Sequence, residues 1–175
     1  LSNSFDVSYN HSDEDKTSEY VGSDPSEYDY QSDEVLVKYS ADQFKITSGV
    51  QRFDGERTSS AGDTTKRNIG YFIQGEYFLD DMTFSLGGRK ESVKYKHSTS
   101  TDSTRDKHDL SAYDFGFNKR LSEELSGFAN FNYAFQAPDI ARFFTYPAPS
   151  YSPTFNNFIS PTKSKTLNIG LNQVN

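Results

Sequence analysis

Apolar and polar residues alternate with a period of two along most of the chain. In residues 69–79 the odd positions are apolar or glycine, while the even positions include Gln74 and Glu76. After Asp80 and Asp81 the alternation resumes in residues 82–89. This period predicts β-strands with one apolar face and one polar face.

Eight such strands are predicted. They lie near residues 1–10, 34–40, 43–53, 68–79, 82–96, 109–121, 125–136 and 164–174. The alternating runs have the length, about 9 to 11 residues, that a tilted strand needs to cross a bilayer.

Short and long connections between the predicted strands alternate along the chain. The short ones are at Ala41-Asp42, Asp80-Asp81 and Ser122-Glu124, and the long ones are residues 11–33, 54–67, 97–108 and 137–163. In an up-and-down barrel this places every short turn on one rim and every long loop on the other, as in outer-membrane barrels. The pattern therefore predicts an all-β, antiparallel, up-and-down transmembrane β-barrel. A soluble β-sandwich is the competing fold, but its architecture does not require short turns at one end and long loops at the other.

The composition agrees with a barrel that is apolar on one surface only. Hydrophobic residues make up 33% of the chain and the mean hydropathy is -0.80, yet 15% of the residues are aromatic. Tyr71 and Tyr133 fall toward the long-loop rim and Tyr39 and Tyr77 toward the short-turn rim, where aromatic girdles lie. The alternate face is rich in Asn, Gln, Ser and Thr, which suits a wet or plugged lumen.

The charge excludes one class of partner. The net charge is -7, and nine acidic residues with a single lysine fall in residues 11–34. Nucleic-acid binding needs a basic face, so no nucleic-acid partner is expected. The acidic run is interpreted as a solvated surface with at most diffuse cation binding near lipopolysaccharide.

The chain shows no catalytic constellation and no cofactor motif, so we expect it not to be an enzyme. Its histidines are His11, His97 and His108, and it has no cysteine. His97 and His108 could hold a transition metal if their loop folded back. Solvated loop histidines are the alternative, because metal sites usually need three or four ligands.

Residues 137–163 form the best candidate for ligand binding. This segment holds five of the six prolines and many aromatic residues, and long loops of this kind are usually functional. The candidate ligand-binding residues are Arg142, Phe143, Phe144, Tyr146, Tyr151 and Phe155. Aromatic rings offer flat contact area to a metal chelate, and an arginine attracts an anionic one. Packing of the rings against one another is the alternative interpretation.

Four stretches resemble the TonB-dependent receptor family. Residues 70–77 are similar to its strand "aromatic-x-Q-x-E-Y", and residues 84–89 to its strand "L-x-x-G-x-R". Residues 133–140 resemble the box "F-R-A-P-x-[IL]", and residues 157–170 the run "N-x-x-L-x-P-E-x-S" with the strand after it. Gln136 stands in place of the box arginine, Thr162 in place of the glutamate, and tryptophan is absent.

The resemblance implies an outer-membrane receptor that takes up a ferric siderophore or similar metal chelate. Its partners would be the chelate, the lipid bilayer with lipopolysaccharide, and TonB, reached through a plug domain that is not in this chain. Family barrels have about 22 strands, so the eight predicted here would be part of a larger barrel. A siderophore is favoured over haem because residues 139–160 contain no histidine. The alternative is a complete eight-stranded outer-membrane barrel acting as an adhesin or structural envelope protein.

Overall fold

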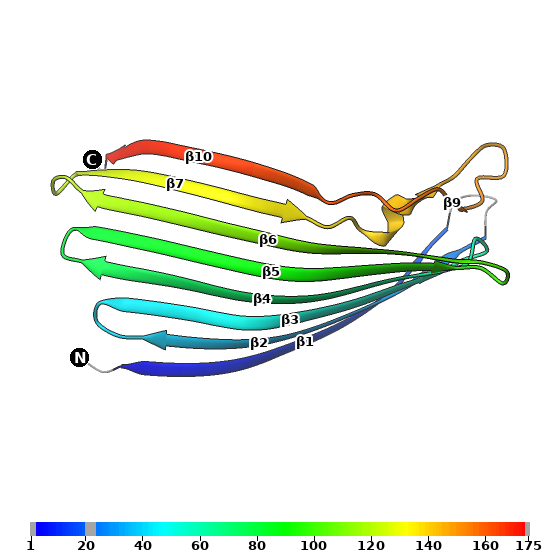
Figure 1. Cartoon of the computed structure of the whole chain (residues 1–175), viewed down its shortest axis with the longest axis horizontal. Helices are drawn as coiled ribbons and strands as arrows, with labels where there is room; N and C mark the ends of the chain where they lie inside the picture. Colours follow the sequence, from blue (N-terminus) through cyan, green and yellow to red (C-terminus); the bar gives the residue numbers. More distant parts are fainter. Residues whose placement is uncertain (1–2, 20–23, 174–175) are drawn as a thin grey trace.

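One antiparallel sheet of eight long strands makes up most of the computed structural model, which describes residues 3–19 and 24–173 (Figure 1). The strands are β1 (Ser4–Ser18), β2 (Ser26–Ser40), β3 (Phe44–Thr58), β4 (Asp63–Leu79), β5 (Met82–Ser98), β6 (Ser103–Arg120), β7 (Leu125–Gln136) and β10 (Thr162–Gln173). Each strand pairs with the next along the chain up to β7, which pairs with β10. The predicted all-β, up-and-down architecture is therefore confirmed.

The register keeps the apolar positions of neighbouring strands on one face. Phe84 lies opposite Phe117, and Phe115 lies opposite Phe131. Ile73 lies opposite Ser48, which shares its face. A shift of one residue would send these side chains to the other side of the sheet. We call the face that carries Ile73 and Phe115 the outward face, and the opposite one the inward face.

The outward face is apolar and uncovered. Ile73 is 57% exposed, Leu86 66% and Ile169 74%. A continuous apolar surface of this kind requires an apolar environment, and hydrocarbon supplies it for an outer-membrane barrel. The outward face is therefore the lipid-facing wall.

Six strands extend further than the sequence pattern predicted. β1 to β6 have 15 to 18 residues each, so most of the predicted loops 11–33, 54–67 and 97–108 is strand. That part of the prediction was wrong, because beyond the apolar band the outward positions are polar or charged, and in β5 the apolar residues Val93 and Tyr95 lie on the inward face instead. Main-chain pairing continues there nevertheless, and only residues 59–62 and 99–102 remain as connections between β3 and β4 and between β5 and β6. Residues 1, 2 and 174 of the predicted strands, and 20–23 of the first predicted loop, lie outside the described residues.

The connection after β7 is long, as predicted, but it is folded. It contains the short 3₁₀ helix η1 (Ile140–Phe143) and the two-residue strands β8 (Phe144–Thr145) and β9 (Thr154–Phe155), which pair with each other. We call residues 137–161 the rim segment, and the end of the sheet where it lies the outer rim. The short turns lie at the opposite end (Figure 1).

The sheet is open within the described residues. β1 and β10 are its two edges and do not pair with each other. The eight strands thus form a section of the wall of a larger barrel, and the alternative of a closed eight-stranded barrel does not hold for this structure. Among the described residues, no helix is long and apolar enough to cross a membrane.

Candidate ligand-binding site at the outer rim

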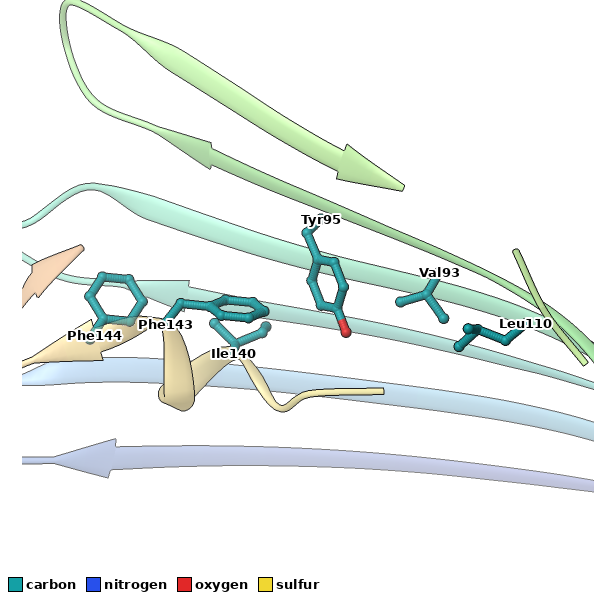
Figure 2. Packing of buried hydrophobic residues seen from close by; sticks show 6 residues of the cluster. All are labelled: Val93, Tyr95, Leu110, Ile140, Phe143 and Phe144. Atoms are coloured by element: carbon teal, nitrogen blue, oxygen red, sulfur yellow. The ribbon is translucent and has the colours of Figure 1, made fainter. Parts of the chain in front are cut away.

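The rim segment packs onto the inward face of the sheet instead of projecting away from it. Ile140 and Phe143 are 0% exposed, and Phe144 is 7% exposed. They form one apolar cluster with residues of β5 and β6 (Figure 2). We call this the rim cluster, and its members are Val93, Tyr95, Leu110, Ile140, Phe143 and Phe144. Burial of these side chains holds the segment against the wall.

Aromatic rings connect the segment to β5. The ring of Tyr95 meets Phe143 edge-on, with centroids 5.0 Å apart and planes at 89°. Phe143 in turn meets Phe158 at 5.2 Å and 90°. Edge-to-face pairs add to the stabilisation that burial gives, because the positive edge of one ring faces the negative face of the other.

Two donors on the sheet bind the same carbonyl of the segment. The Tyr95 hydroxyl and the Lys66 Nζ each donate to the Pro138 carbonyl at 2.9 Å. Burial lowers the pKa of Lys66, against the opposing effect of Asp139 and Glu91. Asp139 accepts from the Ala141 backbone N–H at 2.9 Å and so caps η1.

A buried arginine holds the middle of the segment. Arg57 is 0% exposed, and its guanidinium lies 3.6 Å from the centre of the Phe144 ring. It donates to the hydroxyls of Tyr28, Ser26 and Ser59 at 3.1, 2.7 and 2.8 Å. Within residues 3–19 and 24–173, no carboxylate forms an ion pair with it. Three hydroxyl acceptors and an aromatic face therefore replace water around this charge.

His97 is part of the same packing. Its Nδ1 lies 2.8 Å from the Thr64 hydroxyl, and its ring stacks on Phe155 with centroids 3.9 Å apart. Burial lowers the pKa of His97, and the positive charge of Arg57 lowers it further. The neutral ring is therefore favoured, as stacking in a poorly hydrated site requires.

The other two histidines have carboxylate neighbours, and the ring of His108 also meets Tyr95 of the rim cluster edge-on, with centroids 6.4 Å apart. His108 lies 2.9 Å from Asp106, and His11 lies between Asp13 and Asp33 at 3.0 and 2.9 Å. No grouping of three or more His, Cys, Asp or Glu suited to a metal ion occurs among the described residues.

The six predicted ligand-binding residues divide into two sets. Phe143 and Phe144 are inside the rim cluster, and Tyr146 and Phe155 are half-buried against it. Arg142 and Tyr151 are exposed, Tyr151 by 47%. The structure thus brings four of the six together as packing residues and leaves two facing solvent. Ligand contact by any of them stays a prediction.

A hollow of about 460 Å³ adjoins the rim segment at the tip of the β5–β6 hairpin. His97, Phe155, Thr99 and Asp102 are among the residues that line it. Phe155 therefore reaches both the packed interior and a solvent-accessible recess, where an aromatic ring can contact a bound molecule.

The sequence pattern missed Arg57, Thr64, Lys66 and Tyr95, and it considered His97 only as a metal ligand or a solvated loop histidine. All five fall in or next to stretches that were interpreted as loops or loop borders. A signal was present in β5, where exposed Lys94 and Lys96 alternate with buried Tyr95 and His97. This period of two places aromatic residues on one face and lysines on the other. It indicates that this part of β5 is still a strand but lies outside the hydrocarbon layer.

The fold and the site together define a class of protein. A lipid-facing wall of up-and-down strands, with a folded segment on its inward face at one rim, is a section of an outer-membrane β-barrel. The model of the TonB dependent receptor-like beta-barrel matches residues 1–175, and the chain belongs to this family of TonB-dependent receptors. It is accordingly an outer-membrane protein.

Solved structures of similar fold support this assignment. The copper transporter OprC superposes with a TM-score of 0.70 at 16% identity, over 97% of this chain and 33% of that protein. The alcaligin outer membrane receptor FauA from Bordetella pertussis gives 0.65 at 16% identity, over 95% and 30%. The ferric yersiniabactin uptake receptor FyuA from Yersinia pestis gives 0.57 at 13% identity, over 99% and 31%. The chain thus spans about a third of the length of each. No curated protein matches its sequence.

Proposed function

We propose that the receptor built on this wall takes up a metal chelate, foremost a ferric siderophore, across the outer membrane with energy delivered by TonB. Membership of the family supports uptake in general. The similar structures do not select a cargo, since one is titled a copper transporter and another a ferric yersiniabactin uptake receptor. A plug domain outside this chain would connect the lumen to TonB.

The observation that carries the proposal is the rim segment itself. It lies on the inward face at the outer rim, where a ligand entering the lumen passes, and it presents exposed Arg142 and Tyr151. An exposed cation and an exposed aromatic ring in the same segment suit an anionic chelate with flat organic groups. The cargo undergoes no covalent change at such a site.

Haem is a weaker candidate than a siderophore. Residues 139–160 contain no histidine, and His97, which packs against this segment, is only 5% exposed. Its ring is engaged by Thr64 and stacked on Phe155. A buried and stacked imidazole is poorly placed to bind the iron of an incoming haem.

Within this proposal the six residues have different roles. Arg142, Tyr151 and the recess side of Phe155 contact the chelate, and Tyr146, half-buried against the rim cluster, contributes to the same segment. Phe143 and Phe144 hold the segment in place, because their side chains are almost fully buried.

The test is growth under iron limitation of a strain that lacks the full-length gene, complemented with the wild-type receptor or with Arg142→Ala/Tyr151→Ala. Ferric hydroxamates and ferric catecholates are supplied singly, with haem and a copper salt as the competing cargoes. We expect one class of ferric siderophore to restore growth with the wild-type receptor and poorly with the variant. Arg120→Ala/Tyr77→Ala changes the same residue types near the other rim and should behave as wild type. Growth restored by haem alone would contradict the proposal.

A further inference from the structure

Beyond the apolar band, the charges of the outward face are sorted by sign across the sheet. One row of directly opposed residues crosses six strands, from β1 to β6. Its first three members are acidic and its last two are basic. In strand order the row is Asp15, Asp29, Glu56, Thr65, Lys96 and Arg105. We call it the first row.

The next outward row toward the membrane repeats this order of signs. In strand order it is Asp13, Gln31, Asp54, Arg67, Lys94 and Lys107. The sorting ends one row nearer the membrane, where basic Arg52 lies on β3 and acidic Asp109 lies on β6. We call the two rows together the sorted surface, with an acidic half on β1 to β3 and a basic half on β4 to β6.

This sorting is unfavourable within a single molecule. Asp29 lies directly opposite both Asp15 and Glu56, and Lys96 lies directly opposite Arg105. Like charges opposite each other in a sheet repel and weaken strand pairing. All five residues are exposed, and within residues 3–19 and 24–173 none of the five forms an ion pair. Both halves therefore carry charge that only an external partner compensates.

The sheet is hollowed along the sorted surface, over about 560 Å³. The lining includes two acids of one half and three cations of the other, namely Asp29, Glu56, Lys94, Lys96 and Arg105. The hollow thus crosses the boundary between the two signs, and side chains of a partner can reach both. The sorted surface also lies beyond Ile69, the last apolar outward residue of β4. It is therefore outside the hydrocarbon layer, in water.

We propose that the sorted surface binds the same surface of a second receptor molecule, so that two molecules form a two-fold symmetric dimer. Molecules in one membrane share one orientation, so their two-fold axis is parallel to the membrane normal. Rotation about an axis beside the boundary between β3 and β4 reverses the order of the strands. It places the acidic half of each molecule against the basic half of the other. Each contact is then made twice, as in other isologous interfaces.

A second molecule compensates both halves at once, which no partner of a single sign does. A divalent cation would neutralise the acidic half only, and an anionic lipid the basic half only. Complementary exposed charges fix orientation and partner choice more than they raise affinity. The dimer is therefore weak, and it dissociates as salt screens its charges. This interface lies on the outside of the wall and is independent of the cargo proposed above.

The experiment uses the full-length receptor, purified in detergent with EDTA and freed of lipopolysaccharide, and it measures mass by sedimentation velocity. The acid-reversed variant is Asp15→Lys/Asp29→Lys/Glu56→Lys, and the base-reversed variant is Lys96→Glu/Arg105→Glu. Each variant keeps like charges opposite one another in the first row, so its thermal midpoint should stay near that of the wild type. The control, Asp42→Lys/Glu123→Lys/Glu124→Lys, reverses three exposed acids in the short turns.

Wild type and control should dimerise equally. Each reversed variant alone should dimerise about tenfold or more weakly, because both halves of its first row then carry the same sign. An equimolar mixture of the two reversed variants should form a mixed dimer, since a basic row then faces an acidic one. Recovery in the mixture also shows that neither variant is misfolded.

Four results would overturn the proposal. The wild type could remain monomeric at low salt, or both reversed variants could dimerise as strongly as the wild type. The mixture of the two variants could fail to recover the dimer. Finally, the wild type could dimerise only after divalent cations or lipopolysaccharide are added, which would mean that one of these bridges the molecules.

Discussion

The Tyr95 hydroxyl donates a hydrogen bond to the Pro138 carbonyl at 2.9 Å and so joins β5 to the rim segment 43 positions later in the chain. The same ring packs edge-on against Phe143. One side chain thus supplies both a polar and an apolar attachment. The rim segment is fastened to the barrel wall, and any ligand that displaces it must break these contacts.

Removing the Tyr95 hydroxyl should loosen the segment moderately. For Tyr95→Phe we expect a loss of about 1 kcal/mol, since Lys66 still donates to the Pro138 carbonyl. Tyr95→Ala also removes the ring and should cost about 3 to 5 kcal/mol. Hydrogen exchange of the Asn156 amide, which donates to the Phe143 carbonyl at 2.9 Å, reports the opening of the segment. Tyr113→Phe on the outward face is the control, and equal exchange in all three variants would contradict the assignment.

Acidification should weaken the packing around His97. Its pKa is lowered by burial and then by Arg57, against a smaller opposing effect of Asp63. The unfolded segment therefore takes up a proton below about pH 6.5, the ordinary histidine pKa, while the packed segment resists it. Stability is complete above that pH and falls as the pH drops toward the folded pKa. Exchange of the Asn156 amide should accelerate between pH 7.5 and 5.5, after correction for intrinsic exchange rates. His97→Gln should abolish this dependence.

The sequence predicts the fold well inside the membrane and poorly outside it. Residues such as Ile73 and Phe115 must face lipid, so their alternation is strict and the faces could be assigned from the pattern. At Arg67 both faces of the strand are polar, and at Lys94 the apolar residues Val93 and Tyr95 lie on the inward face, so the pattern of apolar outward positions that identified the strands has ended. Only the register of the whole sheet reveals that these positions are paired.

The candidate site was predictable only in part, for the same reason. The aromatic and proline-rich composition identifies residues 137–163 as a structured segment. It does not show that Phe143 is buried and Tyr151 exposed, because short 3₁₀ and two-residue strand elements have no sequence period of their own. Arg57 was missed because its acceptors, such as Ser26 and Tyr28, lie about 30 positions away in the chain and no local motif records them.

Charge on the outward face should destabilise the barrel according to depth. Arginine at Ile73, Phe84, Phe115, Phe131 or Ile169 should cost about 2 to 4 kcal/mol near the middle of the bilayer. Arginine at Gln74 or Asn130 on the inward face should be tolerated, because the lumen is wet or lined by polar groups. Urea unfolding of the full-length receptor in vesicles measures both sets. Equal losses would mean that the two faces are assigned the wrong way round or that neither meets lipid.

The outer rim should be accessible from outside the cell and the short turns should not. The sequence contains no cysteine, so single cysteines report accessibility without background labelling. Ser100→Cys at the tip of the β5–β6 hairpin should react with a membrane-impermeant maleimide in intact cells. Asp81→Cys in the turn between β4 and β5 should react only after the outer membrane is permeabilised. Labelling of Asp81→Cys in intact cells would reverse the topology.

Exposed and buried residues of the rim segment should affect ligand binding in different ways. Arg142→Ala removes an exposed charge and should weaken binding of an anionic ferric chelate by about 1 kcal/mol or more, while the stability of the barrel stays unchanged. Phe143→Ala empties a fully buried position and should cost about 3 to 5 kcal/mol of local stability. Phe143→Ala then weakens chelate binding only by disordering the rim segment. The loss of affinity should therefore be accompanied by faster exchange of the Asn156 amide.

Both full-length variants are titrated with the chelate that supports growth, and Asn156 exchange is measured in parallel. The two measurements distinguish loss of a direct contact with the chelate from disorder of the rim segment. A third variant, Tyr151→Ala, should resemble Arg142→Ala, because Tyr151 is 47% exposed and packs outside the rim cluster. The contrary result is that Arg142→Ala and Tyr151→Ala bind the chelate as wild type does while Phe143→Ala binds it weakly. In that case the rim segment stabilises the barrel wall and does not contact the chelate. The chelate would then make its contacts on other loops.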